Sequence, residues 1–86
     1  MGKLIIADED LIRRAEQRAT GATVHDVNCH IGRYRSLCET GASPVRISWY
    51  RDVLSIFANG LAPTIAAADK IRYERMKAAR LTEPKK

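Results

Sequence analysis

The chain has 86 residues, of which 45% are hydrophobic and 29% are charged, and its formal net charge is +5. This length and composition are those of one globular domain with one core, which excludes a disordered chain and a protein of several domains. We therefore expect a single helical domain over residues 1–86, with residues 1–7 as an N-terminal arm and residues 82–86 as a frayed basic tail.

Two features of the sequence bear on the compartment of the protein. The apolar run at residues 4–7 is too short for a secretion signal or a membrane span. Cys29 and Cys38 lie on one predicted helix, about 13 Å apart, which is too far for a disulfide. Both features suit a reducing compartment, so we expect a cytoplasmic protein without a membrane partner.

The first two helices are predicted on either side of a short glycine turn. Asp8 favours a helix start and Gly21 a stop, so the first helix is expected over residues 9–20. Thr23 is the expected cap of the second helix, which ends at Gly41. Its apolar residues recur at alternating steps of three and four, the spacing of one buried face: Val24, Val27, Ile31, Tyr34 and Cys38.

The third predicted helix covers residues 44–58, because a capping serine precedes a proline in its first turn. Apolar residues surround most of this helix, which indicates a central element buried on several sides. A fourth helix is expected from residue 63 or 64 to about residue 81, with Ile65, Ala68, Met76 and Ala79 on one face. The predicted fold class is therefore all-α, a small bundle of about four helices around a central apolar helix.

The connection at residues 20–23 is short enough for a helix-turn-helix, which would make the second helix a recognition helix. In that interpretation Asn28 reads an adenine edge, while Arg33 and Arg35 contact phosphates or a guanine. Asp26 would then meet backbone phosphate, which is unfavourable. A plain antiparallel pair of helices is the alternative that we favour.

Residues 21–28, Gly-Ala-Thr-Val-His-Asp-Val-Asn, resemble the turn and second-helix start in the RNA-binding M domain of the signal recognition particle protein. In that family an arginine- and glycine-rich run just upstream makes most RNA contacts, and a methionine-rich groove is present. Here the upstream run keeps only Arg18 of that basic character, and the chain has two methionines. The resemblance covers about a tenth of the chain and implies no function for it.

The positive charge is concentrated in the C-terminal half of the sequence. Residues 1–43 have six basic and six acidic side chains, whereas residues 44–86 have nine basic and four acidic ones. A basic half suits an anionic partner such as nucleic acid. The candidate contacts are scattered around the fourth helix, with Tyr73 between them: Lys70, Arg72, Arg75, Lys77 and Arg80.

The aromatic side chains indicate a second possible surface. Trp49, Tyr50 and Phe57 all lie on the central helix, where core packing is the default. Arg46 falls within the apolar arc of that helix, and arginine beside aromatic residues is typical of protein interfaces. The alternative to a nucleic-acid surface is therefore a protein-binding surface, formed by Arg46, Trp49, Tyr50 and Tyr73.

No motif points to catalysis. His25 and Cys29 have the spacing of two metal ligands on a helix, but the sequence offers no second pair to complete a site. No glycine-rich phosphate-binding loop is present. We expect no enzyme, no metal and no cofactor. Two functions remain: a nucleic-acid-associated regulator, slightly favoured by the charge, and a protein-binding adaptor or inhibitor, with a homodimer as a further option.

Overall fold

The structure is a computed structural model that describes residues 5–82, apart from the side chains of residues 80–82. It has four helices, α1 (Glu9–Arg18), α2 (Thr23–Thr40), α3 (Pro44–Ala58) and α4 (Ile65–Thr82), and the described residues include no strand. The all-α class is therefore confirmed. The bounds of α3 are those predicted, because Ser43 caps it and Pro44 occupies its first turn.

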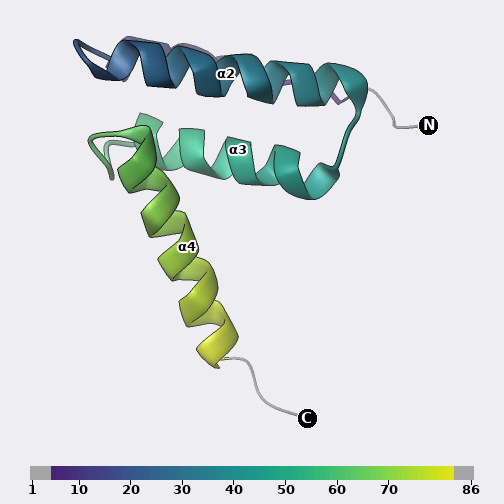
Figure 1. The fold of residues 1–86 in the computed structure, drawn as a ribbon, viewed down its shortest axis with the longest axis vertical. Coiled ribbons are helices and arrows are strands. Elements are labelled where there is room, and N and C mark those ends of the chain that lie inside the picture. Colours follow the sequence, from purple (N-terminus) through teal and green to yellow (C-terminus); the bar gives the residue numbers. More distant parts are fainter. Residues whose placement is uncertain (1–4, 83–86) are drawn as a thin grey trace.

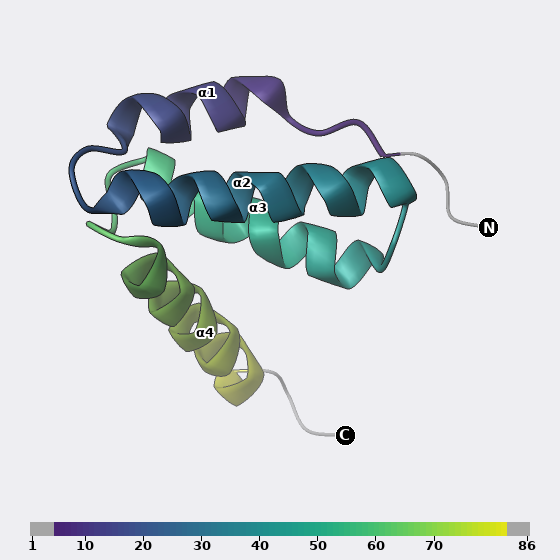
Figure 2. The same ribbon diagram turned by 45° about the horizontal axis from the view of Figure 1, so that its top comes forward.

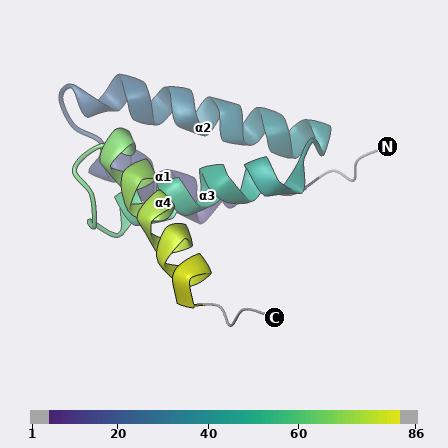
Figure 3. The same cartoon turned by 60° about the horizontal axis from the view of Figure 1, so that its bottom comes forward.

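The helices are arranged around α3, which packs against each of the other three. α1 and α2 run in opposite directions along α3 (Figure 2). α4 starts beside one end of α3 and then leaves the bundle steeply (Figure 1). In Figure 3 its C-terminal half projects past the other helices. The first pair is therefore the antiparallel arrangement that we favoured over a helix-turn-helix.

The core lies between α1, α2 and α3. On α1, Leu11, Ile12 and Ala15 are buried. The predicted stripe on α2 is confirmed, except that Val24 at its start is exposed. The largest group of buried side chains comes from the central helix: Ile47, Tyr50, Val53, Leu54, Ile56 and Phe57.

The expected cap of α2 is wrong. α2 begins at Thr23 itself, and the residue before it, Ala22, makes no capping hydrogen bond with its side chain. The Thr23 hydroxyl instead donates to the Thr20 carbonyl (2.8 Å) and accepts from the Thr20 backbone N–H (3.0 Å). Gly21 has a positive φ of 55°. The Thr23 hydroxyl therefore stabilises the tight turn before α2 and does not cap the N-terminus of the helix.

The expected apolar face of α4 is buried only in its proximal half. Ala68 is buried, and Ile71, which the pattern placed off the face, packs against the core. Met76 and Ala79 are exposed. The reason is the direction of α4, which diverges from α3 (Figure 1). Met76 and Ala79 therefore line an open groove with residues of α3 instead of packing into the core.

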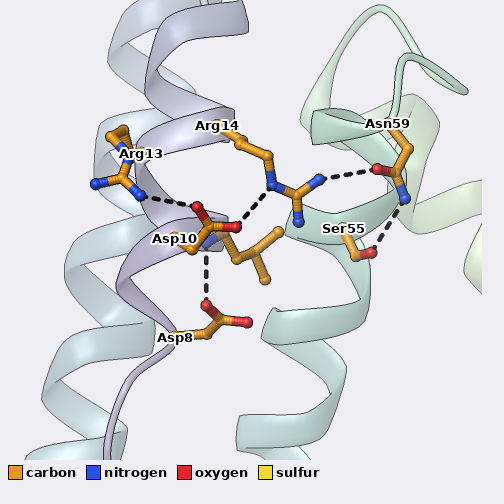
Figure 4. Close-up of polar contacts among 7 residues, drawn as sticks. Asp8, Asp10, Arg13, Arg14, Ser55 and Asn59 are labelled. Atoms are coloured by element: carbon orange, nitrogen blue, oxygen red, sulfur yellow. Dashed lines mark hydrogen bonds and ion pairs between the residues drawn. The ribbon is translucent and has the colours of Figure 1, made fainter.

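A chain of polar contacts joins α1 to the end of α3 (Figure 4). The Arg14 guanidinium donates to Asn59 Oδ1 (3.1 Å), and its Nε lies 3.3 Å from Asp10 Oδ2. Asn59 in turn donates to the Ser55 hydroxyl on α3 (3.4 Å). These exposed contacts fix the register of the two helices more than they stabilise the fold.

The N-terminal arm covers the core only in part. The Ile5 backbone N–H donates to the Cys38 carbonyl at the end of α2 (3.0 Å), and its side chain packs against the core. Ile6 is exposed. Residues 1–4 of the predicted arm lie outside the described residues.

Candidate functional site

The basic residues of α4 divide between two faces. Lys70, Tyr73 and Lys77 follow one another at steps of three and four, so they share one face of the helix. We call these three residues the α4 basic face. With Glu74 and Ala78 they line a hollow of about 380 Å³ on the outer side of α4. Tyr73 is 64% exposed there. Arg80 continues the same register, and its side chain lies outside the described residues.

Arg72 and Arg75 lie on the other side of α4. They line a groove of about 300 Å³ between α3 and α4. The Arg72 side chain is only 18% exposed, and its Nε lies 3.7 Å from Asp52 Oδ2 on α3. Asp69, three residues before Arg72 on the same helix, accepts a hydrogen bond from Trp49 instead of pairing with Arg72. Arg72 is therefore partly neutralised within the fold.

The three polar residues predicted on α2 have different surroundings. Asn28 and Arg33 are exposed. Arg35 binds both carboxylate oxygens of Glu9 on α1, with Nη2 2.8 Å from Oε1. A nucleic acid that contacts Arg35 has to compete with this bidentate pair. Arg33 is therefore the more accessible cation of the two.

Arg46 and Arg33 come together although the sequence assigned them to different surfaces. Both line a hollow of about 240 Å³ between α2 and α3, together with Ser36, Leu37 and Tyr50. Within residues 5–79, neither arginine has an acidic group within 4.0 Å. Two unpaired guanidinium groups on adjacent helices favour an anionic ligand.

The aromatic residues of α3 are held inside the fold. Tyr50 is buried, so it is not available to a partner as the fold stands. Trp49 is half-buried, and its indole N–H donates to Asp69 Oδ1 on α4 (2.8 Å). The Trp49 and Tyr50 rings lie edge to face, with centroids 4.6 Å apart. Of the four predicted partner-binding residues, only Arg46 and Tyr73 are exposed.

His30 is a buried residue that our sequence analysis missed. Its ring lies against Tyr50 (centroids 4.5 Å apart) and Trp49 (6.1 Å). The signal was present, because His30 is three positions from Val27 and four from Tyr34 on the buried stripe of α2. Nε2 lies 3.1 Å from the Tyr50 carbonyl oxygen. A carbonyl only accepts, so Nε2 carries the proton of the neutral ring.

Because His30 is buried, stability is expected to fall on acidification. Burial lowers the pKa of His30 below its ordinary 6.5, against the opposing effects of the Tyr50 carbonyl and Asp69. The unfolded state then binds more protons than the folded state below about pH 6.5, so the free energy of unfolding decreases from that pH down to the folded pKa. Urea unfolding across this range measures the slope. His30→Gln keeps an N–H donor but does not titrate, so its slope should be shallower; equal slopes would contradict the assignment.

A groove of about 460 Å³ lies beside this cluster, between α2, α3 and the start of α4. We call it the His30 groove. Cys29 lines it and is exposed, with Sγ 3.6 Å from His25 Nε2. No three His, Cys, Asp or Glu side chains in the described part of the chain are arranged to hold a metal ion. The lining residues are Asp26, Cys29, His30, Arg33, Trp49, Tyr50, Ile65, Ala66 and Asp69.

The described residues thus form an all-α domain of four helices with open grooves and an exposed basic face on α4. None of these helices, over residues 5–82, combines the length and the apolar character needed to cross a membrane. Comparisons with known protein families, with curated proteins and with solved structures found no match to this chain. The case for a function therefore rests on the surfaces described above.

Proposed function

We propose that this chain is a non-enzymatic binding protein that associates with nucleic acid as a small regulator, through the α4 basic face. One observation carries the proposal. Lys70, Tyr73 and Lys77 line one hollow on α4. Neither lysine has an acidic group within 4.0 Å among residues 5–79, although Glu74 borders the same hollow.

This face has the chemistry of a phosphate contact. Lys70 and Lys77 are seven residues apart, roughly 10 Å along the helix, which is about the rise of three nucleotides of one strand. Tyr73 lies between them and is exposed, so its ring is free to stack on a base. The two ammonium groups would supply affinity without reading sequence.

Other cations contribute unequally to this proposed interface. Arg33 and Arg46 are exposed and unpaired, so they add positive potential on the α2–α3 side. Arg35 and Arg72 are engaged with Glu9 and Asp52, and we assign them a smaller part. Arg75 is exposed on the far side of α4 from Lys70. Base reading by Asn28 stays a prediction.

Binding to labelled single-stranded DNA, duplex DNA and RNA, measured by fluorescence anisotropy over a series of salt concentrations, tests the proposal. We expect affinity for at least one of the three to fall steeply with salt. The double variant Lys70→Gln/Lys77→Gln should bind roughly tenfold more weakly at low salt, at about 0.7 kcal/mol per lysine. Its salt slope should be smaller by about two.

The matched control removes two exposed cations elsewhere. Arg13→Gln/Arg51→Gln lowers the net charge from +5 by the same two units, on α1 and α3. It should bind nearly as well as the wild type, because its sites lie off the α4 basic face. Equal weakening by both variants would indicate only a general charge effect. Absence of binding at low salt in the wild type would reject the proposed function.

A protein-binding adaptor or inhibitor is the second candidate. The observation that favours it is the exposure of three large apolar side chains, Val45, Leu61 and Met76. Arg46 and Tyr73 are the accessible members of the predicted partner surface. A wild-type protein that binds no nucleic acid at low salt, but forms a complex or a dimer in light scattering, would favour this candidate.

A further inference from the structure

The His30 groove differs in chemistry from the rest of the surface. It is lined by two carboxylates, Asp26 and Asp69, and by one guanidinium, Arg33. With His30 neutral, the lining carries one net negative charge in a chain whose net charge is +5. This local reversal favours a cationic ligand over an anionic one, unlike the hollow shared by Arg33 and Arg46.

The groove presents mainly hydrogen-bond acceptors. His30 uses Nε2–H for the Tyr50 carbonyl, so Nδ1 keeps a lone pair with no protein donor in the described part of the chain. Among the described residues, Arg72 Nε is the fully buried side-chain nitrogen or oxygen that lacks a hydrogen-bond partner. His30 Nδ1 is not in that class, so this nitrogen is not sealed in the core. Burial lowers the pKa of His30, which keeps that nitrogen an acceptor. Asp69 accepts one hydrogen bond, from Trp49, and has a second oxygen.

Aromatic rings complete the lining. Trp49 and Tyr50 both border the groove, and the ring contacts with His30 hold them in place. An indole is the side chain that attracts organic cations best, especially beside a carboxylate. The Trp49 indole is also fixed by its hydrogen bond to Asp69, so the aromatic ring and the negative charge are already positioned together.

We propose that the His30 groove is a binding site for a small organic cation that carries N–H donors, an alkylguanidinium or an alkylammonium. The cation lies against Trp49 and donates to Asp69, Asp26 and His30 Nδ1, while its alkyl stem contacts Ile65. The volume of about 460 Å³ lies in the range of small-molecule sites. This site is separate from the α4 basic face and does not depend on nucleic-acid binding.

The test uses n-butylguanidinium as the probe and n-butylurea as its neutral counterpart of similar shape. Trp49 is the one tryptophan of the chain, so its fluorescence reports the groove directly. We expect a saturable change with butylguanidinium and a dissociation constant of about 1 mM, as suits a probe of about eight non-hydrogen atoms. Butylurea should bind at least about tenfold more weakly, because it lacks the charge. No saturable change, or equal binding of the two probes, would overturn the proposal.

Variants locate the site. Asp69→Asn keeps an acceptor for the Trp49 N–H but removes the charge, and Asp26→Asn removes the other carboxylate. Each should weaken butylguanidinium at least about fivefold. Glu39→Gln, an exposed carboxylate of α2 outside the groove, is the matched control and should leave binding unchanged. If Asp69→Asn fails to fold by circular dichroism, the exposed Asp26 decides the matter. Unchanged binding in Asp26→Asn, or equal loss in Glu39→Gln, would refute the site.

Discussion

Replacing Phe57 by alanine is expected to remove a large share of the stability of the protein. Phe57 is 2% exposed on α3, the helix that packs against the other three. Removing its ring takes away apolar burial and leaves a cavity, at a cost of about 3–5 kcal/mol. A domain of this size has a total stability of roughly 5–10 kcal/mol, so about a third or more of it would be lost. Urea unfolding followed by circular dichroism measures the loss.

Val45→Ala is the control on the same helix. Val45 is 76% exposed, so its truncation should change the free energy of unfolding by no more than about 0.5 kcal/mol. The difference between the two variants isolates burial from helix propensity. A Phe57→Ala protein as stable as Val45→Ala would show that α3 is not the centre of the core.

Ala68→Glu is expected to release α4 from the bundle. Ala68 is fully buried in the proximal half of α4. A glutamate there would add volume to a packed site and place a charge without a partner in it, which together cost several kcal/mol, about 3 or more. Asp69 follows directly and accepts from Trp49, so undocking should also break that hydrogen bond. Trp49 fluorescence should shift to longer wavelength as the indole becomes hydrated.

Ala78→Glu places the same substitution on the exposed side of the same helix. Its free energy of unfolding should lie within about 0.5 kcal/mol of the wild-type value. Its Trp49 emission should not shift. Because Ala78 borders the hollow of Lys70 and Lys77, the new carboxylate should weaken nucleic-acid binding even so. An emission shift as large in Ala78→Glu as in Ala68→Glu would mean that the indole does not report docking.

The local features of the fold could be predicted because local interactions decide them. Ser43 accepts from the Arg46 backbone N–H, and Gly41 adopts a left-handed conformation with φ 64°, as the capping rules require. Such contacts involve residues within one helical turn. Thr23 shows where these rules stop, because a hydroxyl beside a turn can serve the turn as well as the helix.

The candidate sites could be predicted only in part. Lys70, Tyr73 and Lys77 were identified by charge and type, but the sequence showed scattered cations rather than a face. Pairing with Asp52 and Glu9 is what removes Arg72 and Arg35 from the set of free cations. Both acids lie on other helices, so no spacing along the chain identifies them as partners.

The sequence by itself determined four helices, their approximate bounds and the apolar stripes that join α1, α2 and α3 into a core. The predicted end of the first helix at residue 20 was too late, because α1 ends at Arg18. Capping and periodicity are properties of neighbouring residues, and they need no knowledge of the fold. Only the tertiary structure decided the direction of α4, the pairing of Arg72 with Asp52 and the meeting of Trp49 with Asp69. These depend on how helices distant in sequence pack, which a weakly amphipathic helix such as α4 does not encode in its own pattern.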